Sequence, residues 1–466
     1  MSSTRDRRAH RESILRNFFA GSAQSSRYIV DKVVGEGAYG VVVAAYDSVK
    51  RERVAVKRIK SVLDSSGMAT RILRELKFLR FLHTHDNIIS VKDVLIPGHR
   101  DSFNDVFVVF ELMPTDLGRL LRSKTKLNAE HVKCFMFQLL RAVNFLHSAR
   151  VFHRDLNPSN ILVDSNCQLR VCDFGLARAA FQRDEEILFW TDYVATRWYR
   201  APELILAHST KYSTAIDMWS VGCIFAEMLG RGKPLFPGLN AQHQFELILN
   251  VTGKPSQAVI DRIGDQRLAQ ALERLPSKPP ASLAAIYKDA DAGAIYLLQR
   301  LLAFDPEERI TASEALSLPY FNEFKFLGWG ATTQPLDERE FAFERVRLSA
   351  EEMRLEFIKE ILEYHPEARE ELLLSRDRCS RVSMLPSQAE QFGQDMDSYA
   401  MTRRTISTDI STVITGEQAA GGGTRDYRST TMGEAELAKV GGAPSHHASS
   451  FANHAQQTDG SVAMEE

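Results

Sequence analysis

HRDLNPSN, at residues 153–160, and DFG, at residues 173–175, are the motifs from which the fold of this chain is inferred. Asn160 and Asp173 offer the hard oxygen ligands that Mg²⁺ prefers. Asp155 can accept a hydrogen bond from an incoming hydroxyl group and orient it. Either string alone could be a surface loop. Together they predict a site that positions a phosphoryl group and neutralises its charge.

A glycine-rich segment precedes these motifs, and residues 34–42 read VGEGAYGVV. Glycines let a backbone approach phosphates closely, although this spacing could equally be a hairpin turn. A Rossmann site requires a helix directly after the glycines, whereas residues 41–43 continue as a strand. We therefore expect a β-hairpin flap over a nucleotide. Its residues are Val34, Gly35, Glu36, Gly37, Ala38, Tyr39, Gly40, Val41 and Val42.

Lys57 ends the apolar strand-like run of residues 54–57. A charged group at the end of a buried strand is costly unless it is paired. The candidate partner is Glu75, within a helical pattern at residues 70–82, although alone it would be read as a solvated carboxylate. The ordered set of flap, lysine, glutamate, HRD, DFG and the APE of residues 201–203 has a very small chance of arising by accident.

Composition excludes several other classes of protein. The chain has 466 residues and a formal net charge of −2, which argues against binding nucleic acid by bulk electrostatics. Its five cysteines form no CxxC pair, so a disulfide scaffold or cysteine-rich zinc site is not expected. No apolar run approaches the ~18 residues of a membrane span.

The hydrophobic pattern divides the chain into unequal parts. Residues 28–112 are rich in β-like runs with one helix, and from residue 117 the pattern becomes helical. Two such packed units imply a crevice, which is a default ligand site. From Leu372 onward only four aromatic residues remain, so we expect a disordered tail. Residues 1–27 are expected to form a flexible extension, with a short amphipathic helix possible at residues 14–20.

Taken together, these motifs resemble those of eukaryotic protein kinases over about residues 28–325, and more narrowly the mitogen-activated protein kinases. The narrower resemblance rests on TDYVATRWYRAPE at residues 191–203, with a TDY lip similar to plant and protist members. It implies an α+β bilobal fold. The expected parts are a β-rich N-lobe with one helix at 28–113, a helical C-lobe at 114–325 with an insert at 238–285, a wrap-around segment at 326–370 and the tail at 371–466.

The resemblance also implies ATP and Mg²⁺ in the crevice. Lys57 would hold the α- and β-phosphates and pair with Glu75, and Asp155 would be the catalytic carboxylate. Asn160 and Asp173 would hold the metal. Phe110 would be the gatekeeper, and Glu111, Leu112 and Met113 would form the hinge that faces adenine. Asp116 would lie at the ribose edge, and Glu203 would pair with Arg309 in the C-lobe.

Regulation by phosphorylation is a further implication. Phosphate on Thr191 would be received by Arg74, Arg154 and Arg178, and phosphate on Tyr193 by Arg197 and Arg200. The implied partners are an upstream dual-specificity MAP kinase kinase, phosphatases, and protein substrates with Ser-Pro or Thr-Pro sites. The implied location is the cytoplasm and nucleus, with neither a nucleic-acid partner nor a membrane span.

Two features depart from the family pattern. Asn157 stands where Ser/Thr-directed members usually have Lys, and losing one preorganised charge at a transition state can slow a reaction by roughly 10²-fold. The alternative function is therefore a weakly active or pseudokinase-like scaffold. We favour activity because Lys57, Asp155, Asn160 and Asp173 are all present. In addition, Arg345 and Arg347 reverse the charge expected of an acidic docking patch, so docking partners are not inferred.

Overall fold

The computed structural model describes residues 4–19, 26–37, 40–99, 102–180, 197–206, 213–262, 266–274, 276, 279–328 and 331–370. Ala38 and Tyr39 of the expected flap lie outside these residues. So do Thr191 and Tyr193 of the expected lip, and the expected tail at 371–466.

The N-terminal part contains a five-stranded sheet with the order β1-β2-β3-β5-β4. Alternate residues of β5 face two separate cores, which explains why the run at residues 106–109 is buried throughout. Val106 and Val108 face the core that includes helix α2, and Phe107 and Val109 face the opposite core. The elements are β1 (Tyr28–Gly37), β2 (Gly40–Asp47), β3 (Glu52–Ile59), α2 (Ser66–Leu82), β4 (Val91–Val94) and β5 (Val106–Glu111).

The N-terminal extension supplies the cover for that second core. Helix α1 (Thr4–Asn17) leads into Phe18, which is only 2% exposed and packs with its ring centroid 5.9 Å from that of Phe107. Arg58 Nη1 also donates to the Phe18 carbonyl at 2.8 Å. Where the sequence suggested a flexible extension, the structure therefore describes a helix at Thr4–Asn17 followed by a buried Phe18. The helix starts earlier than expected and ends at Asn17, because Phe18 leaves it to cover the apolar face of the sheet.

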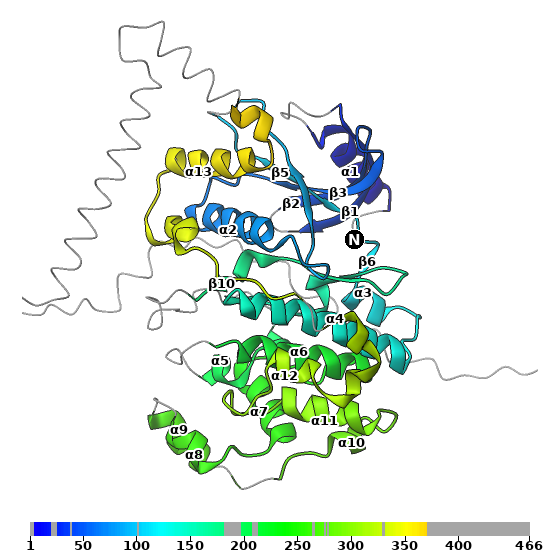
Figure 1. Cartoon of the computed structure of the whole chain (residues 1–466), viewed down its shortest axis with the longest axis vertical. Helices are drawn as coiled ribbons and strands as arrows, with labels where there is room; N and C mark the ends of the chain where they lie inside the picture. Colours follow the sequence, from blue (N-terminus) through cyan, green and yellow to red (C-terminus); the bar gives the residue numbers. More distant parts are fainter. Residues whose placement is uncertain are drawn as a thin grey trace, which may run out of the picture. The chain divides into compact units, whose positions relative to one another are not determined.

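The C-terminal part is helical, and α4 (Ala129–Ser148) and α6 (Ala215–Leu229) lie at its centre (Figure 1). Helix α6 is buried along nearly its whole length. Short strands before and after α4 form a two-stranded sheet, β10-β7, and a three-stranded sheet, β6-β8-β9. Strands β7 and β9 lead into the HRD and DFG motifs. The strands are β6 (Thr115–Asp116), β7 (Val151–Phe152), β8 (Ile161–Val163), β9 (Leu169–Val171) and β10 (Arg178–Ala179). The remaining helices are α3 (Leu117–Arg122), α5 (Pro202–Leu206), α7 (Ala241–Thr252), α8 (Gln257–Asp261), α9 (Gln266–Glu273), α10 (Leu283–Ile286), α11 (Ala292–Leu301) and α12 (Ala312–Leu316).

The segment after the C-lobe returns to α2. Helix α13 (Ala350–Glu363) lies beside α2 in Figure 1, and the 3-10 segment η5 (Glu338–Arg345) precedes it. Glu360 of α13 is almost fully buried and pairs with Arg80 at 2.7 Å and Lys77 at 3.3 Å. These contacts fix the helix that carries Glu75. Within the residues that the structure describes, none of the helices combines the length and apolar character needed to cross a membrane.

Candidate active site

A cavity of about 290 Å³ opens between the sheet and the helical part. It brings together residues that the sequence places far apart, from the flap, β3, α2, the segment after β5 and the catalytic loops. The expected site residues that line it are Val34, Gly35, Val42, Lys57, Glu75, Glu111, Met113, Asp116, Asn160 and Asp173, along with Phe110 and Leu112. The cavity is therefore the crevice predicted between the two parts.

The rest of the expected flap is placed differently. Glu36 and Gly37 end β1 opposite Val41 and Gly40, but none of these four lines the cavity. Val41 is 4% exposed and faces the outer core with Phe18, so its side chain does not face a nucleotide. Gly40 has a φ of +155°, and a Cβ there would lie 1.9 Å from the Arg58 carbonyl oxygen, so this position requires glycine.

The expected ion pair between β3 and α2 is formed. Lys57 Nζ lies 3.0 Å from Glu75 Oε1 and 3.2 Å from Glu75 Oε2. Burial lowers the pKa of Lys57, but Glu75 and Asp173 outweigh that effect, so the net pKa is raised. Lys57 is therefore held as a cation at the wall of the cavity, as contact with phosphate oxygens requires.

Asn160 holds Asp155 through two hydrogen bonds. The Asn160 amide donates to the Asp155 carbonyl at 2.9 Å and to Asp155 Oδ2 at 3.0 Å, which fixes the position of the carboxylate. Burial raises the pKa of Asp155, and although His153 and Asn160 lower it, the net direction is upward. A carboxylate with a raised pKa and one oriented oxygen suits proton acceptance from a hydroxyl group.

Asp173 adopts a left-handed backbone conformation, with φ 64° and ψ 74°, at the entrance to a 3-10 turn. The next residue, Phe174, is fully buried, with its ring centroid 4.9 Å from that of His153. Such strain is held only where surrounding packing enforces it, and here it leaves Asp173 in the lining of the cavity beside Asn160. One carboxylate and one amide oxygen fit a Mg²⁺ ion that takes its other ligands from phosphates and water.

Sequence reasoning missed Asp217, which supports the catalytic loop from inside α6. Its side chain is 1% exposed, and its two oxygens accept the backbone N–H groups of His153 and Arg154 at 2.9 Å each. His147 Nε2 lies 3.1 Å from Asp217 Oδ2. Burial alone would raise the pKa of Asp217. The hydrogen bonds that it accepts and the nearby His147 have the larger effect, so the pKa of Asp217 is lowered overall. The available signal was a carboxylate in the first turn of a strongly apolar helix.

The arginines expected to receive phosphate lie in two places. Arg74 and Arg178 line a cavity of about 790 Å³ beside the start of α2, where Arg74 pairs with Glu344 and donates to the Gly175 carbonyl at 3.1 Å. Arg197 donates to the Leu239 carbonyl at 3.2 Å at the start of the insert. Arg154 is held through its backbone by Asp217, and Arg200 follows the turn at Arg197–Tyr199.

The expected pair of Glu203 and Arg309 is also formed. The two guanidinium Nη atoms of Arg309 donate to the two carboxylate oxygens of Glu203 at 2.7 and 3.1 Å. The Arg309 side chain is completely buried, which makes this bidentate pair an anchor between α5 and the core of the C-lobe.

Known proteins are similar to this sequence over most of its length. Residues 28–321 match the family model described as the protein kinase domain. Mitogen-activated protein kinase 9 of Oryza sativa subsp. japonica is 45% identical over 383 residues, covering 82% of this chain and 54% of that protein. Mitogen-activated protein kinases 9 and 20 of Arabidopsis thaliana are 46% and 43% identical, covering 80% and 87% of this chain and 73% and 68% of those proteins.

The family model covers more than half of the chain, and its match includes the lysine, glutamate, HRD and DFG positions that line or support the cavity. The chain spans about half the length of the rice relative and about 70% of the two Arabidopsis relatives. On these matches the chain belongs to the protein kinase family and, within it, to the mitogen-activated protein kinases, a group of Ser/Thr protein kinases.

Proposed function

We propose that this chain transfers the γ-phosphate of ATP to Ser or Thr residues followed by Pro in protein substrates. The observation that carries the proposal is the closed Lys57–Glu75 pair in a cavity that also contains Asn160 and Asp173. Lys57 binds phosphate oxygens, and Asn160 and Asp173 hold Mg²⁺, which when bound neutralises charge on the phosphates. Asp155 orients the substrate hydroxyl group and accepts its proton.

The runner-up function, a weakly active or pseudokinase-like scaffold, rests on Asn157. In the structure Asn157 Nδ2 donates to the Asp155 carbonyl at 3.0 Å, and Asn157 Oδ1 accepts the Ser159 backbone N–H at 3.0 Å. Asn157 therefore braces the loop that carries Asp155, and its amide supplies no charge. The hydrogen bonds of Asn157 hold the Asp155 loop in place, which favours activity. The absence of a lysine ammonium group at position 157 favours a reduced rate of phosphoryl transfer.

Asn157→Lys is expected to raise the rate of phosphoryl transfer about 10-fold or more, because it adds a cation where charge develops. The change also removes two hydrogen bonds, which costs about 1 kcal/mol of stability for each. The measurement is kcat on a peptide with one Ser-Pro site, for wild type, Asn157→Lys and Asp155→Ala. Wild-type activity above that of Asp155→Ala supports the kinase. If wild type equals Asp155→Ala and Asn157→Lys restores turnover, the scaffold is the correct function.

We also propose that an upstream dual-specificity MAP kinase kinase activates the chain at Thr191 and Tyr193, that phosphatases reverse this, and that the protein acts in the cytoplasm and nucleus. What supports the switch is the position of Arg74, which joins α2 to the DFG turn through the Gly175 carbonyl. A phosphate has nearly two charges and can replace the single carboxylate of Glu344 at Arg74. We expect phosphorylation to hold the helix that bears Glu75 more firmly against the DFG turn.

Treatment with an activating kinase is expected to raise kcat at least about 10-fold less in the double variant Thr191→Ala/Tyr193→Phe than in wild type. The reason is that each charge-assisted hydrogen bond to a phosphate contributes about 1.5–3 kcal/mol. The measurement is kcat before and after that treatment. Arg74→Ala is measured as a second variant. It removes one arginine that is expected to bind the Thr191 phosphate, and it leaves the hydroxyl groups of Thr191 and Tyr193 in place. Full activation of the double variant would show that the switch lies elsewhere.

A further inference from the structure

The strands that line the nucleotide crevice have two faces. Val42 of β2 and Ala55 of β3 line the crevice, along with Lys57. Successive side chains of a strand point to opposite faces, so the sequence neighbours of Val42 and Ala55 face away from the crevice. Those neighbours lie in the outer core, on the face of the sheet opposite α2, and they are Val41, Val43, Val54 and Val56. The packing of the outer core therefore determines where the backbone of β2 and β3 holds Val42 and Ala55.

Residues from outside the sheet close the outer core. Phe18 is 2% exposed, and its ring centroid lies 5.9 Å from that of Phe107 on β5. Ile14 and Leu15 of α1 pack against the same core, and α1 lies beside β1 in Figure 1. Among the described residues, all other buried members of this core belong to the sheet, apart from Leu95, which directly follows β4. Phe18 is therefore the buried contact through which the N-terminal segment (residues 14–18) supports β2 and β3.

Arg58 joins the N-terminal segment to the strand that carries Lys57. Its Nη1 atom donates to the carbonyl of Asn17, the last residue of α1, at 2.9 Å and to the Phe18 carbonyl at 2.8 Å. Carbonyls at a helix C-terminus have no partner within the helix, so an arginine side chain is well suited to satisfy them. Arg58 Nε also donates to Asp105 Oδ2 at 2.8 Å, which holds the guanidinium group in place. Because Arg58 directly follows Lys57, these hydrogen bonds hold β3 at the position of Lys57.

We propose that Phe18 and Arg58 are positioning residues for the nucleotide. By holding the N-terminal segment on the outer core, they keep β2 and β3 in the arrangement that binds ATP. This inference rests on the proposed binding of ATP in the crevice. Strands that are already held lose less conformational freedom when a ligand binds, so more of the interaction free energy appears as affinity. Without this support, ATP itself must order the strands.

The expected effect is on ATP affinity rather than on the chemical step. The substrate hydroxyl group is oriented by Asp155, which Asn160 and the Asp217-supported loop hold in the C-terminal part of the chain. A loss of binding that is equal in the ground state and the transition state raises KM and leaves kcat unchanged. A merely structural role of Phe18 and Arg58 would instead lower the melting temperature without changing ATP affinity.

The test uses the whole chain and compares wild type with Phe18→Ala, Phe18→Leu and Arg58→Met. The Kd for ATP with Mg²⁺ is measured by titration calorimetry, and kcat and KM by phosphorylation of a Ser-Pro peptide. Phe18→Ala and Arg58→Met should each raise the Kd and the KM for ATP by about 5-fold or more, the size of a typical coupling between two sites. The kcat at saturating ATP and the KM for the peptide should change by less than about 2-fold. Phe18→Leu keeps most of the apolar volume and should recover most of the affinity. Arg58→Met leaves Phe18 in place, so it tests the inference even if Phe18→Ala folds poorly.

Hydrogen exchange of the nucleotide-free protein gives a second measurement, which does not depend on ATP. The backbone amides of β2 should exchange about 5-fold faster or more in Phe18→Ala and Arg58→Met than in wild type, because the strand opens locally more often. If wild type binds no ATP, the proposed function fails, whereas unchanged exchange of β2 overturns the present inference alone.

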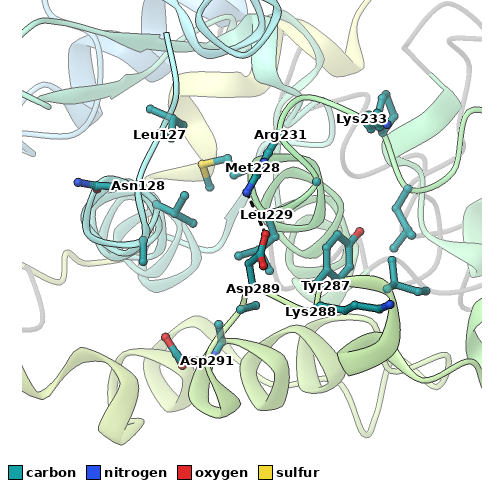
Figure 2. Close-up of a pocket in the computed structure, with 18 of the residues that line it drawn as sticks. Leu127, Asn128, Met228, Leu229, Arg231, Lys233, Tyr287, Lys288, Asp289 and Asp291 are labelled. Atoms are coloured by element: carbon teal, nitrogen blue, oxygen red, sulfur yellow. Dashed lines mark hydrogen bonds and ion pairs between the residues drawn. The ribbon is translucent and has the colours of Figure 1, made fainter.

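Met228→Ala is the matched control for a loss of stability. Met228 is 3% exposed and lines a separate cavity, of about 530 Å³, in the C-lobe (Figure 2). Among the described residues this cavity shares no lining residue with the nucleotide crevice. Met228→Ala should therefore lower the melting temperature, as a large-to-small change in a core does, and leave ATP affinity and β2 exchange unchanged.

Phe326→Ala, at an 81% exposed side chain, is the control for the loss of a phenylalanine and should change none of these quantities. The inference is overturned if Phe18→Ala and Arg58→Met bind ATP like wild type, or if Met228→Ala weakens ATP binding as much as they do.

Discussion

Asp155→Asn is expected to lower kcat for phosphoryl transfer by about 10²–10⁴-fold, the usual contribution of a positioned proton acceptor. The substitution preserves shape, and its amide oxygen can still accept the hydrogen bond that Asn160 Nδ2 gives to Asp155 Oδ2 at 3.0 Å. The loss therefore arises from the missing proton acceptor. ATP affinity should be nearly unchanged, because Asp155 does not line the cavity that contains Lys57.

The measurement compares kcat, ATP affinity and the pH profile of the two proteins. Because the pKa of Asp155 is raised, wild-type activity should fall at a pH above the ordinary range for aspartate as the carboxyl group takes up a proton. That acidic limb should be absent from the variant. Asp261→Asn, which changes an exposed carboxylate of the C-lobe, is the control and should retain wild-type activity. Residual activity above a tenth of wild type would show that another group takes the proton.

The positions of several expected site residues could be predicted because those residues belong to short sequence motifs. Lys57 ends a strand and needs a partner, and the HRD and DFG motifs fix the relative positions of Asp155, Asn160 and Asp173 along the chain. The pairing of Lys57 with Glu75 required only that α2 pack on the sheet. The Lys57–Glu75 pair is found, and Asn160 and Asp173 line the same cavity, because each placement depends on local spacing and on a single packing contact.

Long-range packing explains what the sequence did not reveal. Phe18 was read as part of a flexible extension, since nothing near it in the sequence shows that the outer face of the sheet needs a cover. Val41 was assigned to the nucleotide, but irregular pairing of β1 with β2 prevents simple alternation from fixing which side chains face the cleft. The Arg74–Glu344 pair joins residues 270 positions apart, and local spacing does not encode such a contact.

Asp217→Ala is expected to lower the free energy of unfolding by about 3–5 kcal/mol, because it leaves buried groups without their acceptor. The groups affected are the backbone N–H groups of His153 and Arg154 and the ring of His147. For a folded unit of this size the melting temperature should fall by roughly 5–15 °C. Catalysis should fall as well, since the same N–H groups hold the loop that carries Asp155.

Denaturant unfolding at several pH values tests the cause. The folded-state pKa of Asp217 lies below its unfolded value, so its stabilisation is fully present above the unfolded pKa and is lost as pH falls through the folded pKa. The difference between wild type and variant should therefore be largest near neutral pH and shrink in acid. Asp289→Ala, at an 86% exposed side chain, should change stability by no more than about 0.5 kcal/mol. A difference that did not shrink in acid would mean that the lost stability comes from the cavity left by the side chain, and that the charge of Asp217 does not hold the catalytic loop.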